Sequence, residues 1–200
     1  GVLVCSAADE QYEPQIVGDG AAGAIIAWYD WRSGDRDIYM QRLDSGGVPL
    51  WTANGAPICT VAGVQDSPSL TQDFSGGALV VWSDRRNGVN FDVYGQRVSA
   101  AGTTQWPANG MPLCTAGGSQ LYPRVIRDPA GGFFATWFDY RSGNPDVYVQ
   151  RMDYDGPLWT PDGVVLCTEP NLQEIPNVCP DGVGGAIVTW YDARAGVPNY

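Results

Sequence analysis

The stretch "WYDWRSGDRDIYMQR" at residues 28–42 returns along the chain with small changes. Its counterparts are "WSDRRNGVNFDVYGQR" from Trp82, "WFDYRSGNPDVYVQR" from Trp137 and a shorter "WYDARAGVPNY" from Trp190. The tryptophans that open these stretches are 54, 55 and 53 residues apart, and one cysteine per copy keeps the same spacing: Cys5, Cys59, Cys114 and Cys167. Such a fixed period indicates a repeat architecture.

Each repeat predicts about four short antiparallel strands and no helix. In the first repeat, residues 24–29 are apolar on both faces, residues 37–43 alternate, and residues 51–58 carry an Asn-Gly turn signal. One such sheet cannot bury both of its faces, so the copies must stack on one another. The fold class is therefore all-β, a β-propeller of four-stranded antiparallel blades with about 3.7 repeats in this chain. A β-solenoid-like repeat array is the alternative.

The repeat also divides the chain, which we treat as a single propeller segment over residues 1–200. Residues 1–5 are expected to be the last strand of a preceding repeat. Repeats one to three are expected at 6–59, 60–114 and 115–167, and a truncated fourth repeat at 168–200.

The charge pattern narrows the chemistry and the partners. The chain has no His and no Lys, and its eleven basic residues are all Arg, so histidine bases and lysine Schiff bases are excluded. A net charge of −11 disfavours nucleic acid as a partner. No apolar run approaches the roughly 20 residues that span a bilayer, so no membrane insertion is expected.

Repetition separates structural residues from catalytic ones. A catalytic pair such as Asp30 with Asp37 is needed once, whereas the Asp and Arg of the W-x-D-x-R turn and the Asp that starts the next strand recur. We interpret them as a structural frame, in which the first Asp accepts loop N–H groups and the Arg pairs with the second Asp or a neighbouring blade. The frame comprises Asp30, Arg32, Asp37, Asp84, Arg86, Asp92, Asp139, Arg141, Asp146, Asp192 and Arg194.

Ligand chemistry is expected where the repeats differ. Between the Asp and Arg of the turn lie Trp31, Arg85, Tyr140 and Ala193. Trp31 and Tyr140 are amphipathic aromatics that can stack on a sugar ring, and Arg85 is the third candidate ligand-binding residue.

The cysteines and the acidic turns offer two further hypotheses. Cys179 is the one cysteine outside the repeat spacing, so Cys167 and Cys179 are the pair expected to form a disulfide if any does. No closely spaced D-x-D-x-D-G loop is present, so Ca²⁺ stays a minor alternative and no cofactor or metal site is expected.

The pattern "GGAxxxWxDxRSGxxDxYxQRxDxxGxxxWxxNGxxxC" resembles a β-propeller repeat of large secreted bacterial surface proteins, most of them without an assigned activity. The resemblance implies a secreted or cell-surface location. Together with the equivalent surface on every repeat, it favours a non-catalytic scaffold or adhesion module that binds proteins or itself, in a fibre or surface layer, and is not an enzyme. A carbohydrate-binding module is the alternative, and a polysaccharide-active hydrolase using Asp carboxylates is the second alternative.

Overall fold

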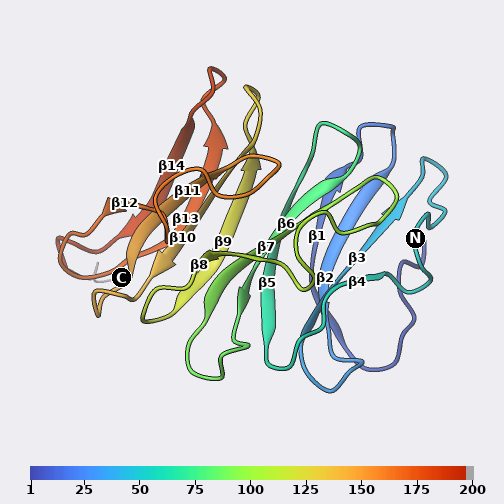
Figure 1. Cartoon of the computed structure of the whole chain (residues 1–200), viewed down its shortest axis with the longest axis horizontal. Helices are drawn as coiled ribbons and strands as arrows, with labels where there is room; N and C mark the ends of the chain where they lie inside the picture. The colour runs from blue at the N-terminus through green and yellow to red at the C-terminus, as the bar shows by residue number, and fades with distance from the viewer. Residues whose placement is uncertain (197–200) are drawn as a thin grey trace.

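The structure, a computed structural model, describes residues 1–196 of the chain. Within those residues it contains fourteen strands and no helix, arranged as three four-stranded antiparallel sheets and one two-stranded sheet. Figure 1 shows these sheets side by side, from the blue sheet at the N-terminus to the red one at the C-terminus. The predicted β-propeller is confirmed, because each sheet is one blade and sequence neighbours pair within it.

The strand bounds repeat with the period of the sequence. In the first blade the strands are β1 (Gln11–Gly18), β2 (Ala24–Asp30), β3 (Asp37–Leu43) and β4 (Ala56–Cys59). In the second they are β5 (Gln65–Gln72), β6 (Ala78–Asp84), β7 (Asp92–Val98) and β8 (Met111–Cys114). In the third they are β9 (Gln120–Arg127), β10 (Phe133–Asp139), β11 (Asp146–Met152) and β12 (Val164–Cys167), and the fourth blade has β13 (Gln173–Pro180) and β14 (Ala186–Asp192).

The first strand of every blade is its innermost one. Strands β1, β5, β9 and β13 contact one another in succession, whereas β4, β8 and β12 lie on the outer side of their sheets. Each innermost strand begins at the same end of the propeller as the hairpin between the second and third strands. The Trp31 amide donates to the Glu10 carbonyl at 3.0 Å and the Gln65 amide to the Arg36 carbonyl at 2.8 Å, which joins the first hairpin to β1 and β5. We call this the upper end.

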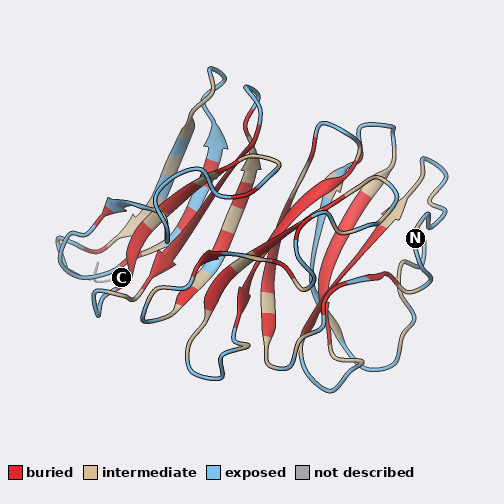
Figure 2. Cartoon of the chain, in the orientation of Figure 1, coloured by how far each residue is buried: buried red, intermediate tan, exposed pale blue. Residues whose placement is uncertain are grey.

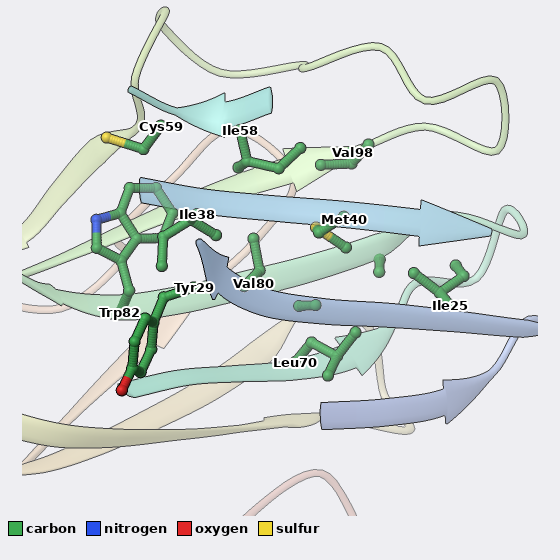
Figure 3. Close-up of a cluster of buried hydrophobic side chains, with 12 residues drawn as sticks. Ile25, Tyr29, Ile38, Met40, Ile58, Cys59, Leu70, Val80, Trp82 and Val98 are labelled. Carbon is green, nitrogen blue, oxygen red and sulfur yellow. The ribbon is translucent and has the colours of Figure 1, made fainter. Parts of the chain in front are cut away.

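The hydrophobic core lies between the blades, as stacking of two-sided sheets requires. The middle strands β2, β6 and β10 are buried along almost their whole length, as the red ribbons in Figure 2 show. Figure 3 shows the cluster between the first two blades, where Ile25 and Met40 of the first blade pack with Val80 and Trp82 of the second. A second cluster joins the second and third blades around Val93 and Trp137.

Three predictions from the sequence have different outcomes in the structure. The β-solenoid alternative is wrong, because the strands form separate blades. Residues 1–5 form no strand, although Cys5 contacts Arg32 as Cys59 contacts Arg86, so their assignment to a preceding repeat stays a prediction. The end of the predicted fourth repeat, 197–200, lies outside the described residues. Within residues 1–196 no helix has the length and hydropathy of a membrane span.

Candidate functional site

The W-x-D-x-R turn is built around a buried carboxylate. Asp84 has no exposed surface and accepts hydrogen bonds from Trp82 Nε1 at 2.8 Å, from the Arg86 amide at 2.9 Å and from the Arg86 guanidinium at 2.6 and 2.9 Å. The same guanidinium donates to the Asn109 carbonyl at 2.7 Å and lies 3.7 Å above the Tyr94 ring. The equivalent contacts recur around Asp30, Asp139 and Asp192. Both oxygens of such a carboxylate accept hydrogen bonds from the Trp and the Arg of the same W-x-D-x-R motif.

The arginine partner differs from the one that the sequence predicted. The expected fork onto Asp37, Asp92 or Asp146 does not form, because Arg32, Arg86, Arg141 and Arg194 each pair with the Asp two residues earlier. The short turn places that carboxylate beside both the backbone N–H and the guanidinium of the arginine, so one acceptor satisfies both donors.

The second aspartate of the frame is buried and forms no ion pair within residues 1–196. Asp37 accepts from the Ser33 hydroxyl, and Asp92 accepts from the Asn87 amide group at 3.0 Å. Burial raises the pKa of the Asp37 carboxyl above its ordinary value and raises the pKa of Asp92 to about 6.

The predicted Cys167–Cys179 disulfide is not formed. Both cysteines are free, and Cys167 is buried where the Arg194 guanidinium donates to its Sγ at 3.4 Å. Cys167 ends β12 at the upper end, whereas Cys179 lies six residues into β13, roughly 20 Å further along at about 3.3 Å per residue. That separation is far beyond the reach of a disulfide.

The innermost strands share an unusual backbone conformation. Each contains a bulge near its start, and one non-glycine residue in each bulge has a positive φ: Glu13 (50°), Ser67 (53°), Tyr122 (50°) and Ile175 (53°). The backbone is repeated, but the four side chains are not. Bulges and strained backbones are frequent beside functional sites because they redirect a side chain. The bulge therefore holds four chemically different side chains at one level near the propeller axis.

Two carboxylates of adjacent blades meet at this level. Asp66 accepts from Arg36 at 2.7 Å across the boundary between the first and second blades. Glu13 is an exposed residue of β1, but neighbouring atoms partly desolvate its carboxyl group, which raises the pKa of that group above its ordinary value. The negative charge of nearby Asp66 raises the pKa further, while Arg36, Arg124 and Ser67 oppose the shift. Burial also raises the pKa of Asp66, although the ion pair with Arg36 opposes it. The two acids are therefore electrostatically coupled.

A third carboxylate lies at the same level in the fourth blade. Glu174 occupies the position in β13 that Asp66 occupies in β5, and it accepts from the Tyr140 hydroxyl at 3.3 Å. It lines a cavity of about 430 Å³ together with Arg124 of β9. Because Arg124 also acts on the pKa of Glu13, Glu13 and Glu174 share a cationic neighbour.

The three predicted ligand-binding residues lie in three different places. Trp31 lies next to the carboxylates, because the Arg36 guanidinium that holds Asp66 is 5.3 Å from its ring centre. Tyr140 lies beside Glu174. Arg85 is exposed, with its guanidinium 5.8 Å from the Phe91 ring centre, and it forms no ion pair within residues 1–196.

The acids of the innermost strands were not predicted from the sequence. The signal that reveals them is the pair of residues between the recurring Gln and Pro, which reads Tyr-Glu, Asp-Ser, Leu-Tyr and Glu-Ile in the four repeats. Neither Asp30 nor Asp37 takes part in this site. The described part of the chain holds no group of three or more His, Cys, Asp or Glu residues arranged for a metal ion.

Two solved structures share this fold over most of the chain. The endo-arabinase of Bacteroides thetaiotaomicron VPI-5482 is 14% identical, with a TM-score of 0.56 over 92% of this chain and 71% of its own. The GH93 alpha-L-arabinofuranosidase of Fusarium graminearum, in complex with arabinobiose, is also 14% identical, with a TM-score of 0.53 over 89% of this chain and 58% of its own. Identities this low show the β-propeller fold alone. No family model and no curated protein matches the chain.

These comparisons overturn the main functional prediction. The sequence favoured a non-catalytic scaffold that is not an enzyme, but both similar propellers are enzymes that act on carbohydrates. The finding favours the hydrolase alternative and gives no support to self-association in a fibre or surface layer.

Proposed function

We propose that the protein is a glycoside hydrolase acting on a polysaccharide at the upper end of the propeller. The observation that carries the proposal is the set of carboxylates on the innermost strands: Glu13 of β1, Asp66 of β5, which Arg36 holds at 2.7 Å, and Glu174 of β13, which lines a cavity of about 430 Å³. Glycosidases need one carboxyl group that keeps its proton and a second that is ionised, and environments that shift the pKa of each set these roles.

The contacts favour one role for each carboxyl group. Glu13, with its raised pKa, donates the proton to the leaving-group oxygen as the glycosidic C–O bond breaks. Asp66 is held by Arg36, and its charge keeps the proton on Glu13, so it is a positioning residue. Glu174 lines the cavity and takes the base or nucleophile role, accepting the proton of the attacking water or bonding to the sugar carbon.

Aromatic residues flank the acids on both sides. The Tyr12 and Tyr29 rings lie 5.6 Å apart, and the Arg36 guanidinium is 5.2 Å from the ring centre of Tyr29 and 5.3 Å from that of Trp31. The Phe138 and Tyr140 rings lie 5.9 Å apart beside Glu174. We propose that Trp31 and Tyr140 stack on sugar rings that flank the scissile bond. Replacing Trp31 with Ala is expected to raise KM with little change in kcat, since such a contact binds ground state and transition state alike. Replacing Tyr140 with Ala is expected to lower kcat as well, because the Tyr140 hydroxyl donates to Glu174.

The test is hydrolysis of a polysaccharide panel, with arabinan first because both similar structures are arabinose-directed enzymes. The whole chain is expected to release reducing ends, and Glu13→Gln and Glu174→Gln each to lower kcat about 10²–10⁴-fold. Asp155→Asn is the matched control, because Asp155 is an exposed acid in the turn between β11 and β12. No turnover by the wild type on the panel, or full activity in both Gln variants, overturns the proposal.

Location follows from the proposed substrate. Polysaccharides of this kind lie outside cells, so we propose a secreted or cell-surface protein, and assign its repeat to the secreted bacterial propellers that the pattern resembles. Fractionation of the native source with an antibody tests the location, and a signal confined to the cytosol contradicts it.

A further inference from the structure

The cavity beside Glu174 has a composition that a neutral sugar does not require. It has a volume of about 430 Å³, within the range of small-ligand sites. It lies between the third and fourth blades and is lined by Tyr122, Arg124, Phe138, Glu174, Ile175 and Pro176. An aromatic wall and a cation thus stand beside the proposed base.

Arg124 is the unusual residue in this set. Eight of the eleven arginines form an ion pair, but Arg124 forms none with any residue in the range 1–196, and its NH1 reaches only the Pro123 carbonyl at 3.5 Å. It is also not part of the repeated frame. The equivalent positions in the other blades hold neutral side chains, Gln15, Ser69 and Asn177. A partly buried guanidinium that lacks a carboxylate partner presents its planar set of donors to an anion.

Within residues 1–196 the nearby acids form no ion pair with this cation. Asp66 is paired with Arg36 instead. The charge of Arg124 lowers the pKa of Glu13, but desolvation and the charge of Asp66 raise it by more than Arg124 and Arg36 lower it. Glu174 is held by the Tyr140 hydroxyl.

Tyr122 supplies a surface for a ring. Its φ of 50° turns it out of the strand at the bulge, 49% of its surface is exposed, and its ring stacks on Phe138 with 5.6 Å between ring centres. A ring fixed from behind offers its other face to the C–H groups of a sugar. Arg124 follows Tyr122 by two residues on β9, so both side chains come from one rigid strand.

We propose that this pocket binds a uronic acid residue of the polysaccharide, with its carboxylate on the Arg124 guanidinium and its ring on Tyr122. The inference rests on the proposed function, since it assigns the sugar class that occupies the same site. It differs from the arabinose sugars of the similar enzymes, which carry no charge.

The test measures binding rather than turnover, so its outcome is independent of hydrolysis. Trigalacturonate and arabinotriose are titrated calorimetrically into the whole chain carrying Glu13→Gln, which prevents consumption of either ligand. We expect trigalacturonate to bind more tightly, and its affinity to fall as the salt concentration rises because the contact is an ion pair.

Two variants locate the contact. Arg124→Gln is expected to weaken trigalacturonate binding at least about tenfold and to leave arabinotriose unchanged, because a charge-assisted hydrogen bond is lost. Arg127→Gln is the matched control: Arg127 lies three residues further on the same strand, has no ion pair within residues 1–196, and packs over Phe74, 4.4 Å from the ring centre. Circular dichroism checks that both variants are folded.

The outcomes separate the two proposals. Equal or weaker binding of the acidic sugar, no binding of either sugar, or an Arg124→Gln variant that binds like the Arg127→Gln control overturns the uronate inference. If any of these results is found and the wild type still hydrolyses a neutral polysaccharide, only the uronate inference is wrong and the hydrolase proposal remains supported. Arg124-dependent binding of trigalacturonate without turnover by the wild type supports the inference and removes the hydrolase.

Discussion

Replacing Asp84 by Ala tests whether the recurrent turn is a major source of stability. Asp84 is fully buried and accepts four hydrogen bonds, one from Trp82 Nε1 and three from Arg86, at 2.6–2.9 Å. The variant leaves the Arg86 guanidinium, whose side chain is only 21% exposed, beside Cys59 without a counter-charge. Breaking a buried ion pair on one side costs about 3–5 kcal/mol.

That loss is large for a protein of this size. Total stabilities are typically about 5–15 kcal/mol, and a loss of 3–5 kcal/mol corresponds to a fall in Tm of roughly 6–20 °C for a chain of about 200 residues. Urea unfolding followed by circular dichroism gives the free energy of unfolding. The m-value is expected to stay constant, since the surface exposed on unfolding hardly changes.

The fourth blade supplies the matched control. Asp192 makes the same contacts with Trp190 and Arg194, but its side chain is 22% exposed and that of Arg194 is 48% exposed. Water screens this pair, so Asp192→Ala is expected to lose clearly less stability. A loss below about 1 kcal/mol for Asp84→Ala, or an equal loss in both variants, refutes the argument that burial makes this turn a major contributor to stability.

Three further outcomes follow from the same structure. Burial raises the pKa of Asp92 to about 6, so the folded state holds a proton there that the unfolded state has already lost. The free energy of unfolding of the wild type should therefore fall as the pH rises through 6, and the urea midpoint should fall less in Asp92→Asn. Gly110→Ala should lose about 1–3 kcal/mol in urea unfolding and more than Gly88→Ala, since both have positive φ but only at Gly110 would a Cβ meet an indole ring, at 2.5 Å. Iodoacetamide should label exposed Cys179 in the native protein but Cys59, whose pKa burial raises to about 12, only in urea, and five free thiols should be counted.

The fold could be predicted from the sequence because its signals are local and repeated. Apolar runs such as residues 24–29 and turn pairs such as Asn54-Gly55 recur at a constant period, and strand β2 and the Gly55 turn lie where that period places them. The partner of Arg32 could not be predicted in the same way. Two aspartates, Asp30 and Asp37, lie within reach in sequence, and only the three-dimensional path of the hairpin decides between them.

The candidate site was harder to predict because its residues come from different blades. Glu13, Asp66 and Arg36 are not neighbours in sequence, and only the packing of β1 against β5 makes the two acids interact. Trp31 and Tyr140 were predicted as candidate ligand contacts because the residue between the turn Asp and Arg varies. The same comparison at the two residues between Gln and Pro would have indicated Glu13 and Asp66.

The repeat explains how a frame and a site can share one blade design. The turn carboxylates make the same contacts in every blade, so they fix the path of each hairpin. Backbone hydrogen bonds then join the hairpin to the start of the next innermost strand. The bulge repeats as faithfully, since φ is 50–53° in all four blades, yet its side chain is acidic in β1, a hydroxyl in β5, aromatic in β9 and aliphatic in β13. A constant backbone with variable side chains at one level is what an asymmetric ligand requires from a pseudo-symmetric protein. Arg124 is likewise not part of the recurring frame, because the equivalent residue in each of the other three blades is neutral.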